Sequence, residues 1–203
     1  MRKYLLLLAQ LICLDQATAA NDIVLYPNGV SRPGIYIPGF RTYSANPYSP
    51  SAENVALLRE FKQAFPPMRI AGFSSYAPGE ASLVCRLSYP VYLPGKIPYE
   101  AYLAEAMRAE LLEAGLYAED ASVGINGHLV AMDFNSFGTG KWTIEATFSI
   151  DGKEPIAIKH EYTYSVAAGA VRACNDVSRA LVPAMQDFLH AVYSNPQFKD
   201  LLR

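Results

Sequence analysis

The sequence predicts an α+β fold, a two-layer sandwich in which two main helices cover one face of a mostly antiparallel sheet of four to five strands. Residues 123–166 alternate apolar and polar side chains with a period of two, as half-buried strands do. Apolar residues recur at helical spacing before this stretch, over 98–115, and after it, over 167–193. The resulting order is strand, helix, three strands, helix, and the apolar face of such a sheet needs helices to cover it.

The strongest strand pattern is a hairpin. Apolar and polar residues alternate over 141–150 and again over 156–164, and an Asp-Gly turn signal separates the two runs. If the loop occupies 151–155, Trp142 lies opposite Tyr164, and this aromatic cross-strand pair contributes about 0.2–1 kcal/mol.

A third strand precedes the hairpin and joins it through the loop Asn135–Gly140. By alternation, its inward-facing residues are His128, Val130, Met132 and Phe134. His160 on the hairpin also faces inward, but the two histidines should stand about 10 Å apart because one strand separates them. That distance is too long for a shared metal, so we interpret both histidines as core residues.

Two strands and a helix come before this meander. The strands are predicted over 69–76 and 82–93, and the second places one set of residues on a common face: Leu83, Cys85, Leu87, Tyr89 and Val91. The helix begins after Pro98 and ends at Gly115, which suits a C-terminal cap. Because this helix connects the 82–93 strand to the strand beginning near Ser122, those two strands are expected to be parallel.

The last helix is predicted over 167–193. Its apolar stripe consists of Cys174, Val177, Leu181, Met185, Phe188, Leu189 and Val192. Pro183 lies inside this run and predicts a kink or a break near 179–183, because proline has no backbone N–H to donate.

Two of the three cysteines are predicted to face the interface between the sheet and the helices. Cys85 lies on the apolar face of its strand, and Cys174 lies near the start of the apolar stripe of the last helix. In an oxidising compartment such a pair forms a disulfide, and neither sequence context is typical of an exposed, activated thiol. We therefore predict a structural disulfide between Cys85 and Cys174.

The N-terminus predicts export. A basic start, an apolar run of about ten residues from Leu5, and small residues near Ala20 are typical of a cleaved signal peptide over 1–20. The run is too short to span a bilayer, which needs ~20 residues, and no later segment is apolar enough to cross one. Cys13 lacks the small residues that precede a lipidated cysteine, so we expect a periplasmic or secreted protein rather than one anchored to the outer membrane.

The remaining chain divides into an arm and a domain. Residues 21–66 combine an extended stretch rich in Pro, Gly and Tyr with a short helix that Ser51 caps, and we expect the arm to cover the domain in preference to reaching a partner. Residues 67–203 form the single α+β domain. Removal of 1–20 leaves 17 − 2 = 15 basic and 19 − 1 = 18 acidic residues, a net charge near −3. This charge gives no footprint for nucleic acid or for an anionic membrane.

Patterns typical of catalysis do not occur in the sequence. Asp133 and Glu145 lie on different faces of neighbouring predicted strands, so they form no carboxylate dyad. The run 138–141 contains Gly and Lys but lacks the full phosphate-loop pattern and precedes a strand instead of a helix. We predict no catalytic residue, no cofactor and no metal.

Several blocks of the sequence resemble a group of uncharacterised bacterial envelope lipoproteins, over about residues 81–198. The blocks are Cys85-Arg86-Leu87, Glu110 to Gly115, Gly127 to Trp142, Ala173-Cys174 and Leu181 to Gln186. The predicted topology is also similar to that of the lipopolysaccharide-assembly lipoprotein and of the auxiliary lipoproteins of ABC-type envelope transporters. The resemblance implies two helices on a four-stranded sheet, while fold likeness alone transfers function poorly.

We therefore expect an exported, non-enzymatic envelope accessory protein that binds another envelope component, either a protein or a lipid-linked molecule. Phe137 and Lys141, at the loop before the hairpin, are the candidate partner contacts, although a loop aromatic can equally fold back on the core. The alternative is a periplasmic small-ligand-binding protein or an enzyme with a cleft between the arm and the sheet. A secreted protein that acts outside the cell is a third option.

Overall fold

The computed structural model describes residues 41–203 and, in the N-terminal region, the strands β1 (Ile23–Leu25) and β2 (Ser31–Pro33), which pair antiparallel. The expected signal peptide over 1–20 and Cys13 lie outside the described residues. The chain divides into two compact units, 1–39 and 40–203, and the sheet and helices of the α+β fold belong to the second unit.

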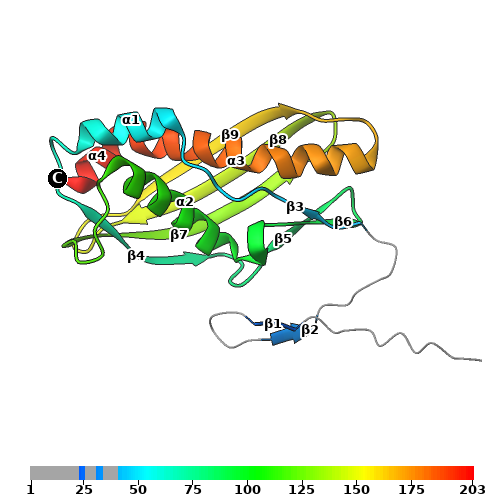
Figure 1. The fold of residues 1–203 in the computed structure, drawn as a ribbon, viewed down its shortest axis with the longest axis horizontal. Helices are drawn as coiled ribbons and strands as arrows, with labels where there is room; N and C mark the ends of the chain where they lie inside the picture. Colours follow the sequence, from blue (N-terminus) through cyan, green and yellow to red (C-terminus); the bar gives the residue numbers. More distant parts are fainter. Residues whose placement is uncertain (1–22, 26–30, 34–40) are drawn as a thin grey trace, which may run out of the picture. The chain divides into compact units, whose positions relative to one another are not determined.

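The predicted α+β fold is confirmed, with a four-stranded sheet in the order β4-β7-β8-β9. Its strands are β4 (Met68–Ser75), β7 (Val123–Asn135), β8 (Thr139–Ser149) and β9 (Ile156–Ser165). Strand β4 runs parallel to β7, and the other neighbours are antiparallel (Figure 1). A second sheet in the order β3-β6-β5 consists of β3 (Tyr43–Ser44), β6 (Tyr89–Tyr92) and β5 (Ser82–Cys85).

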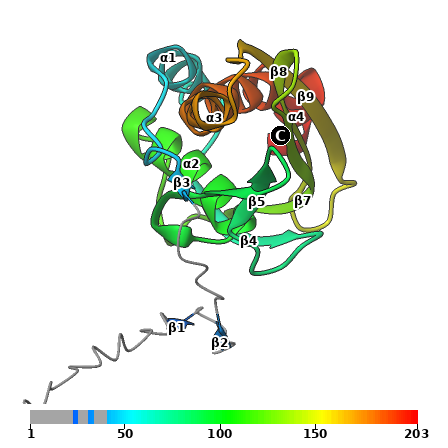
Figure 2. The ribbon, with the colours of Figure 1, turned by 90° about the vertical axis from the view of Figure 1, so that its right-hand side faces the viewer.

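Helices cover one face of the larger sheet. They are α1 (Ala52–Phe61), α2 (Tyr99–Ala114), α3 (Ala170–Ser194) and α4 (Pro196–Leu202), with a short 3₁₀ turn, η1 (Pro94–Lys96), before α2. Helix α2 packs against β4 and β7, and α3 packs against β8 and β9, so the two long helices share the inner face. Helix α1 packs on α2 and α3, and Figure 2 shows it on the side of α3 away from β8 and β9.

Aromatic residues hold the helices on the sheet. Trp142 on β8 is buried, and its ring centre lies 4.9 Å from that of Phe134 on β7. The Trp142 indole N–H donates a hydrogen bond of 3.1 Å to the carbonyl oxygen of Val177 on α3. Further along β8, the Phe148 ring contacts aromatic rings of α3 and α4. Each buried ring removes a large apolar area from water, and this burial stabilises the two-layer arrangement.

The predicted strand over 82–93 is wrong in one respect, because the chain reverses direction within it. Cys85 pairs with Tyr89 across a turn in which Arg86 and Leu87 have φ angles of +49° and +65°. No glycine, proline or asparagine marks this turn in the sequence. The alternation of apolar and polar residues therefore predicts one continuous strand across it. The hairpin belongs to the small sheet, and the parallel neighbour of β7 is β4.

The register of the hairpin formed by β8 and β9 also differs from the prediction. Trp142 pairs with Tyr162, not with Tyr164, and the last pair before the turn joins Phe148 to Ile156. The connection is therefore two residues longer than expected. A shift of two residues leaves every side chain on its predicted face, because side-chain direction alternates with a period of two.

A β-bulge in β7 explains why the prediction for His128 is wrong. The pairing with β8 shifts between Leu129 and Ala131, so Val130 is the extra residue. Before the bulge the odd-numbered residues face the core, whereas after it the even-numbered residues do, and Leu129 and Met132 are both buried. His128 therefore lies on the outer face of the sheet and is exposed.

The predicted N-terminal cap of α1 and the predicted C-terminal end of α2 are both confirmed. Ser51 caps α1 by accepting from the backbone N–H of Asn54, and Gly115 ends α2 with a φ of +71°. Near 179–183 either a kink or a break was predicted, and the break does not occur, because α3 continues through Pro183 as one helix. Tyr43 and Ala45 are buried, so residues 41–50 of the predicted arm cover the domain as expected.

Candidate functional site

Three large apolar side chains are exposed on two neighbouring loops at one end of the domain. Leu87 is 88% exposed and Val84 is 65% exposed on the β5–β6 hairpin, and Phe137 is 54% exposed in the loop between β7 and β8. We call these three residues the apolar tip. Other exposed large apolar residues lie on other elements, for example Leu112 on α2. Exposed large apolar side chains are common in interaction sites, and the contact between Arg86 and the Phe137 ring shows that the two segments adjoin.

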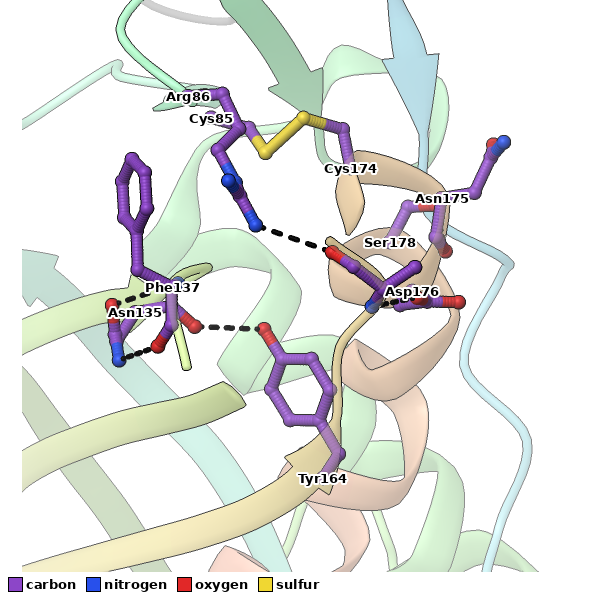
Figure 3. Close-up of a disulfide and its surroundings, with 10 residues drawn as sticks. Cys85, Arg86, Asn135, Phe137, Tyr164, Cys174, Asn175, Asp176 and Ser178 are labelled. Carbon is purple, nitrogen blue, oxygen red and sulfur yellow. Dashed lines mark hydrogen bonds between the residues drawn. A yellow bond between two sulfur atoms is a disulfide. The ribbon is translucent and has the colours of Figure 1, made fainter. Parts of the chain in front are cut away.

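The predicted disulfide between Cys85 and Cys174 is confirmed, and it fixes the tip hairpin to helix α3 (Figure 3). The two Cα atoms are 5.8 Å apart, and both cysteines are fully buried. Cys85 is the residue before the turn, so the covalent bond is placed next to the most exposed apolar side chain of the tip. The hairpin therefore cannot move away from the start of α3 while the bond is intact.

Arg86 joins the two loops of the tip. Its guanidinium carbon lies 4.1 Å from the centre of the Phe137 ring, which is a cation–π contact (Figure 3). One of its terminal nitrogens donates a hydrogen bond of 3.2 Å to the carbonyl oxygen of Ala167, just before α3. The Asp176 carboxylate on α3 in turn accepts from the backbone N–H of Ala167 at 2.9 Å. The hydrogen bond to Ala167 thus holds the Arg86 guanidinium over the Phe137 ring, and the Asp176 carboxylate in turn holds Ala167.

The side chain of Asn135 orders the loop that carries Phe137. Its amide nitrogen donates to the carbonyl oxygens of Phe137, at 2.7 Å, and of Thr139, at 3.0 Å. Its amide oxygen accepts from the Phe137 N–H at 3.0 Å. The Tyr164 hydroxyl donates to the Asn135 carbonyl oxygen at 3.2 Å, which ties the loop to β9. Phe137 therefore points outward from an ordered loop instead of folding back into the core.

The backbone of the tip turn is strained. Arg86 and Leu87 both have positive φ angles, a region in which an L-residue other than glycine costs roughly 1–2 kcal/mol. Leu87 is almost fully exposed, so its own packing does not offset this cost. Residues kept in such conformations cluster at functional sites, where the surrounding structure holds them in place. Here the adjacent disulfide and the Arg86 contacts do so.

Lys141, the second candidate contact, does not belong to the apolar tip. It lies on the outer face of β8, and its ammonium group is 2.9 Å from a carboxylate oxygen of Glu161 on β9. This hydrogen bond lowers the pKa of the Glu161 carboxyl group. The structure therefore separates the two predicted contacts. It adds Arg86, which contacts the Phe137 ring, and the exposed Val84 and Leu87 of the same hairpin as Arg86.

A buried carboxyl group between the helices is a feature that we did not predict. One oxygen of Glu110 on α2 accepts from the Tyr48 hydroxyl at 2.5 Å, the Ser51 N–H at 3.1 Å and the Asn54 amide at 3.0 Å. Burial raises the pKa of Glu110, and these three hydrogen bonds oppose that rise. The Glu110 position could have been found from spacing, since it lies three residues after the buried Met107. The cluster joins α1 and the chain before it to α2.

The surface of the described residues is hollowed in places, and two of these hollows bear on function. One, of about 410 Å³, lies on the outer face of the sheet, and its lining includes Ser74, Asn126, His128, Thr147 and Ser149. A nitrogen of His128 lies 2.9 Å from the Ser74 hydroxyl there, and both side chains are exposed. The other, of about 430 Å³, lies where Tyr43 of the arm meets Tyr92 of β6.

The two histidines that were predicted to share the inner face lie on opposite faces of the sheet. His128 is on the outer face, whereas His160 is on the inner face and lies 2.7 Å from the Asp187 carboxylate on α3. Within the described part of the chain, no group of three His, Cys, Asp or Glu side chains could hold a metal ion. The helices described in the structure also include none that is long and apolar enough to cross a membrane.

Comparisons with known proteins identify structures with a similar fold but give no information on function. No protein-family model matches the sequence, and no curated protein matches it. The structure is similar to the crystal structure of a Xanthomonas campestris protein assigned to family model DUF330, with a TM-score of 0.50 and 9% sequence identity. That match covers 79% of this chain and 99% of the other. A second crystal structure, of an uncharacterised protein, has a TM-score of 0.42 and 10% identity over 74% of this chain and 98% of the other.

Proposed function

We propose that this chain is an exported accessory protein of the bacterial cell envelope and that it binds another envelope component through the apolar tip. The observation that carries the proposal is Leu87, an apolar side chain that is 88% exposed on a strained turn beside the disulfide. The strain and the exposure both cost free energy in the isolated protein. A partner that buries Leu87 and Phe137 would recover part of that cost.

The architecture of the tip supports a preformed binding surface. Its two loops are fixed by a covalent bond, a cation–π contact and the hydrogen bonds of Asn135. A rigid surface loses little conformational entropy when it binds, so even a small apolar contact can be specific. Arg86 adds a positive charge against the Phe137 ring, and arginine and aromatic residues are enriched among those that dominate binding energy.

The disulfide also supports export. Disulfides form and persist in oxidising compartments such as the periplasm, and the N-terminal pattern is that of a secretory signal. The sequence resemblance to envelope lipoproteins agrees with such a location. The absence of a convincing lipid-modification sequence at Cys13 favours a periplasmic or secreted form of the protein.

The proposal is tested by purifying tagged protein from envelope extracts after mild crosslinking. We expect the wild type to capture a reproducible envelope component, and Phe137→Ala and Leu87→Asn each to lose it. Leu112→Gln is the matched control, because Leu112 is also an exposed apolar residue but lies on α2. Recovery of the wild-type chain without any partner, or equal capture by all three variants, would contradict the proposal.

The alternative function, small-ligand binding or catalysis, has one observation in its favour. The hollow on the outer face of the sheet brings Ser74 within hydrogen-bond distance of His128 among other polar side chains. Both side chains are exposed, whereas catalytic groups usually lie in sites that exclude water. The hollow where Tyr43 meets Tyr92 is closer to the place predicted for a cleft beside the arm. Retention of partner capture in a His128→Ala variant would separate this alternative from binding at the tip.

A further inference from the structure

We propose that β9 is the contact between two copies of this chain, which pair antiparallel across their β9 edges and join two four-stranded sheets into one of eight strands. This proposal does not depend on the apolar tip, which lies on other loops. Strand β9 is the outermost strand of its sheet, and within residues 41–203 no strand pairs with its free edge. Such an edge presents unpaired backbone N–H and C=O groups that can pair with another strand.

Half-buried side chains show that the inner face is incompletely covered at this edge. Ile156, Tyr162 and Tyr164 point toward the helices, yet each is only partly buried, whereas Trp142 and Phe148 on the neighbouring β8 are fully buried. A second strand beside β9 would give these three residues new apolar neighbours on the same face.

Charges on the outer face select one register for the pairing. Lys159 and Glu161 are exposed there, two residues apart on either side of His160. When two copies pair with His160 opposite the partner's His160, Lys159 lies opposite the partner's Glu161. The two-fold symmetry then forms the same ion pair a second time. Because nine of the ten residues of β9 pair in this register, it also uses almost the whole strand.

The neighbouring registers are unfavourable. A slip by one residue in the pairing would bring outer-face residues opposite inner-face residues, which the pleat does not allow. The next registers on either side place Lys159 opposite the partner's Lys159, or Glu161 opposite the partner's Glu161, and like charges that face each other directly are destabilising. Charge complementarity therefore specifies both the occupant of the edge and its position.

Charges within each copy extend this arrangement. Lys159 lies 3.6 Å from Glu145 on β8, and Glu161 lies 2.9 Å from Lys141. Across the contact the outer face would then carry alternating charges in the order Glu145, Lys159, the partner's Glu161 and the partner's Lys141. A second row, related by symmetry, would carry the same charges in reverse. Lys159 and Glu161 thus each have a neighbour of opposite sign on both sides, one in their own copy and one in the partner, which favours this pairing over association with an unrelated strand.

Two single charge reversals test the proposal. In Lys159→Glu both rows place Glu opposite the partner's Glu161, and in Glu161→Lys both rows place Lys159 opposite the partner's new lysine. Since two pairs change from attraction to repulsion, we expect each variant to dimerise at least roughly tenfold more weakly than the wild type. An equimolar mixture of the two variants restores both ion pairs in the heterodimer, so it should dimerise nearly as tightly as the wild type.

Sedimentation equilibrium of the mature chain measures these affinities, and circular dichroism confirms that each variant is folded. Glu105→Lys, an exposed charge reversal on α2, is the control and should dimerise like the wild type. A wild-type chain that stays monomeric up to about 0.1 mM, a range that includes weak interfaces, would overturn the proposal. So would a dimer that neither reversal weakens, or folded variants whose mixture remains monomeric. The tip variants Phe137→Ala and Leu87→Asn should leave dimerisation unchanged, so the two proposals fail separately.

Discussion

Replacement of both cysteines by alanine should remove a large share of the stability of the domain. Cys85 and Cys174 are 89 residues apart in sequence, and the bond restricts the unfolded chain over that whole loop. The chain-entropy model gives a loss of about 4.6 kcal/mol at 25 °C for a loop of this length. Loss of the two buried sulfur atoms from the core adds to this value. A typical domain is stable by about 5–15 kcal/mol, so the variant should remain folded but close to its limit.

Urea unfolding followed by tryptophan fluorescence measures this loss, since Trp142 is the single tryptophan and is buried in the core. With a denaturant slope of about 2 kcal/mol/M, the midpoint should fall by about 2 M. Wild-type protein reduced before the measurement should give a similar midpoint, which separates the effect of the bond from that of the substitutions. A loss below about 1 kcal/mol in both samples would refute the argument, because it would mean that the bond hardly restricts the unfolded chain.

Three further predictions concern single positions. Leu87→Asn should leave the free energy of unfolding unchanged or raise it by up to about 1 kcal/mol, because asparagine tolerates the positive φ of this turn. Thermal unfolding checks this expectation, alongside the loss of partner capture. Glu110→Ala should cost about 2–5 kcal/mol, since it removes the acceptor of three hydrogen bonds from Tyr48, Ser51 and Asn54 inside the protein. Glu110→Gln keeps the acceptor oxygen and should be nearly neutral. The raised pKa of Glu110 means that the folded state holds this proton more tightly than the unfolded state does. The contribution of the proton to the free energy of unfolding therefore falls as pH rises through the folded-state pKa. In wild-type protein the urea midpoint should show this decrease with pH, and in Glu110→Gln the decrease should be absent. Gly127→Ala should cost about 1–3 kcal/mol in urea unfolding, because the added methyl group would clash with the Phe73 ring. An unchanged midpoint would show that the ring moves freely.

Alternation and helical spacing predicted the fold class because burial imposes both periods on the sequence. The half-buried strands β8 and β9 and the capped helix α2 each follow such a period, and their residues face as predicted. The disulfide followed from the same reasoning, since two cysteines on inward faces of packed elements must lie near one interface.

Irregular backbone was the main source of error. The turn at Arg86 and Leu87 has no glycine, proline or asparagine, and the bulge at Val130 reverses the inward face without any marker in the sequence. Both features depend on tertiary contacts: the disulfide and the Arg86 contacts hold the turn, and pairing with β8 defines the bulge. The apolar tip was therefore only partly predictable. Phe137 followed from its place in a loop, while Leu87 was assigned to a buried strand face.

Site-specific photo-crosslinking in intact envelopes tests the central claim most directly. A photoreactive phenylalanine derivative would replace Phe137 in one variant and Leu112, an exposed residue of α2, in another. Binding at the apolar tip predicts a discrete crosslinked product from position 137 that is absent from position 112. It also predicts that the product disappears when Leu87→Asn is added. No product at position 137, or the same product from both positions, would contradict the account.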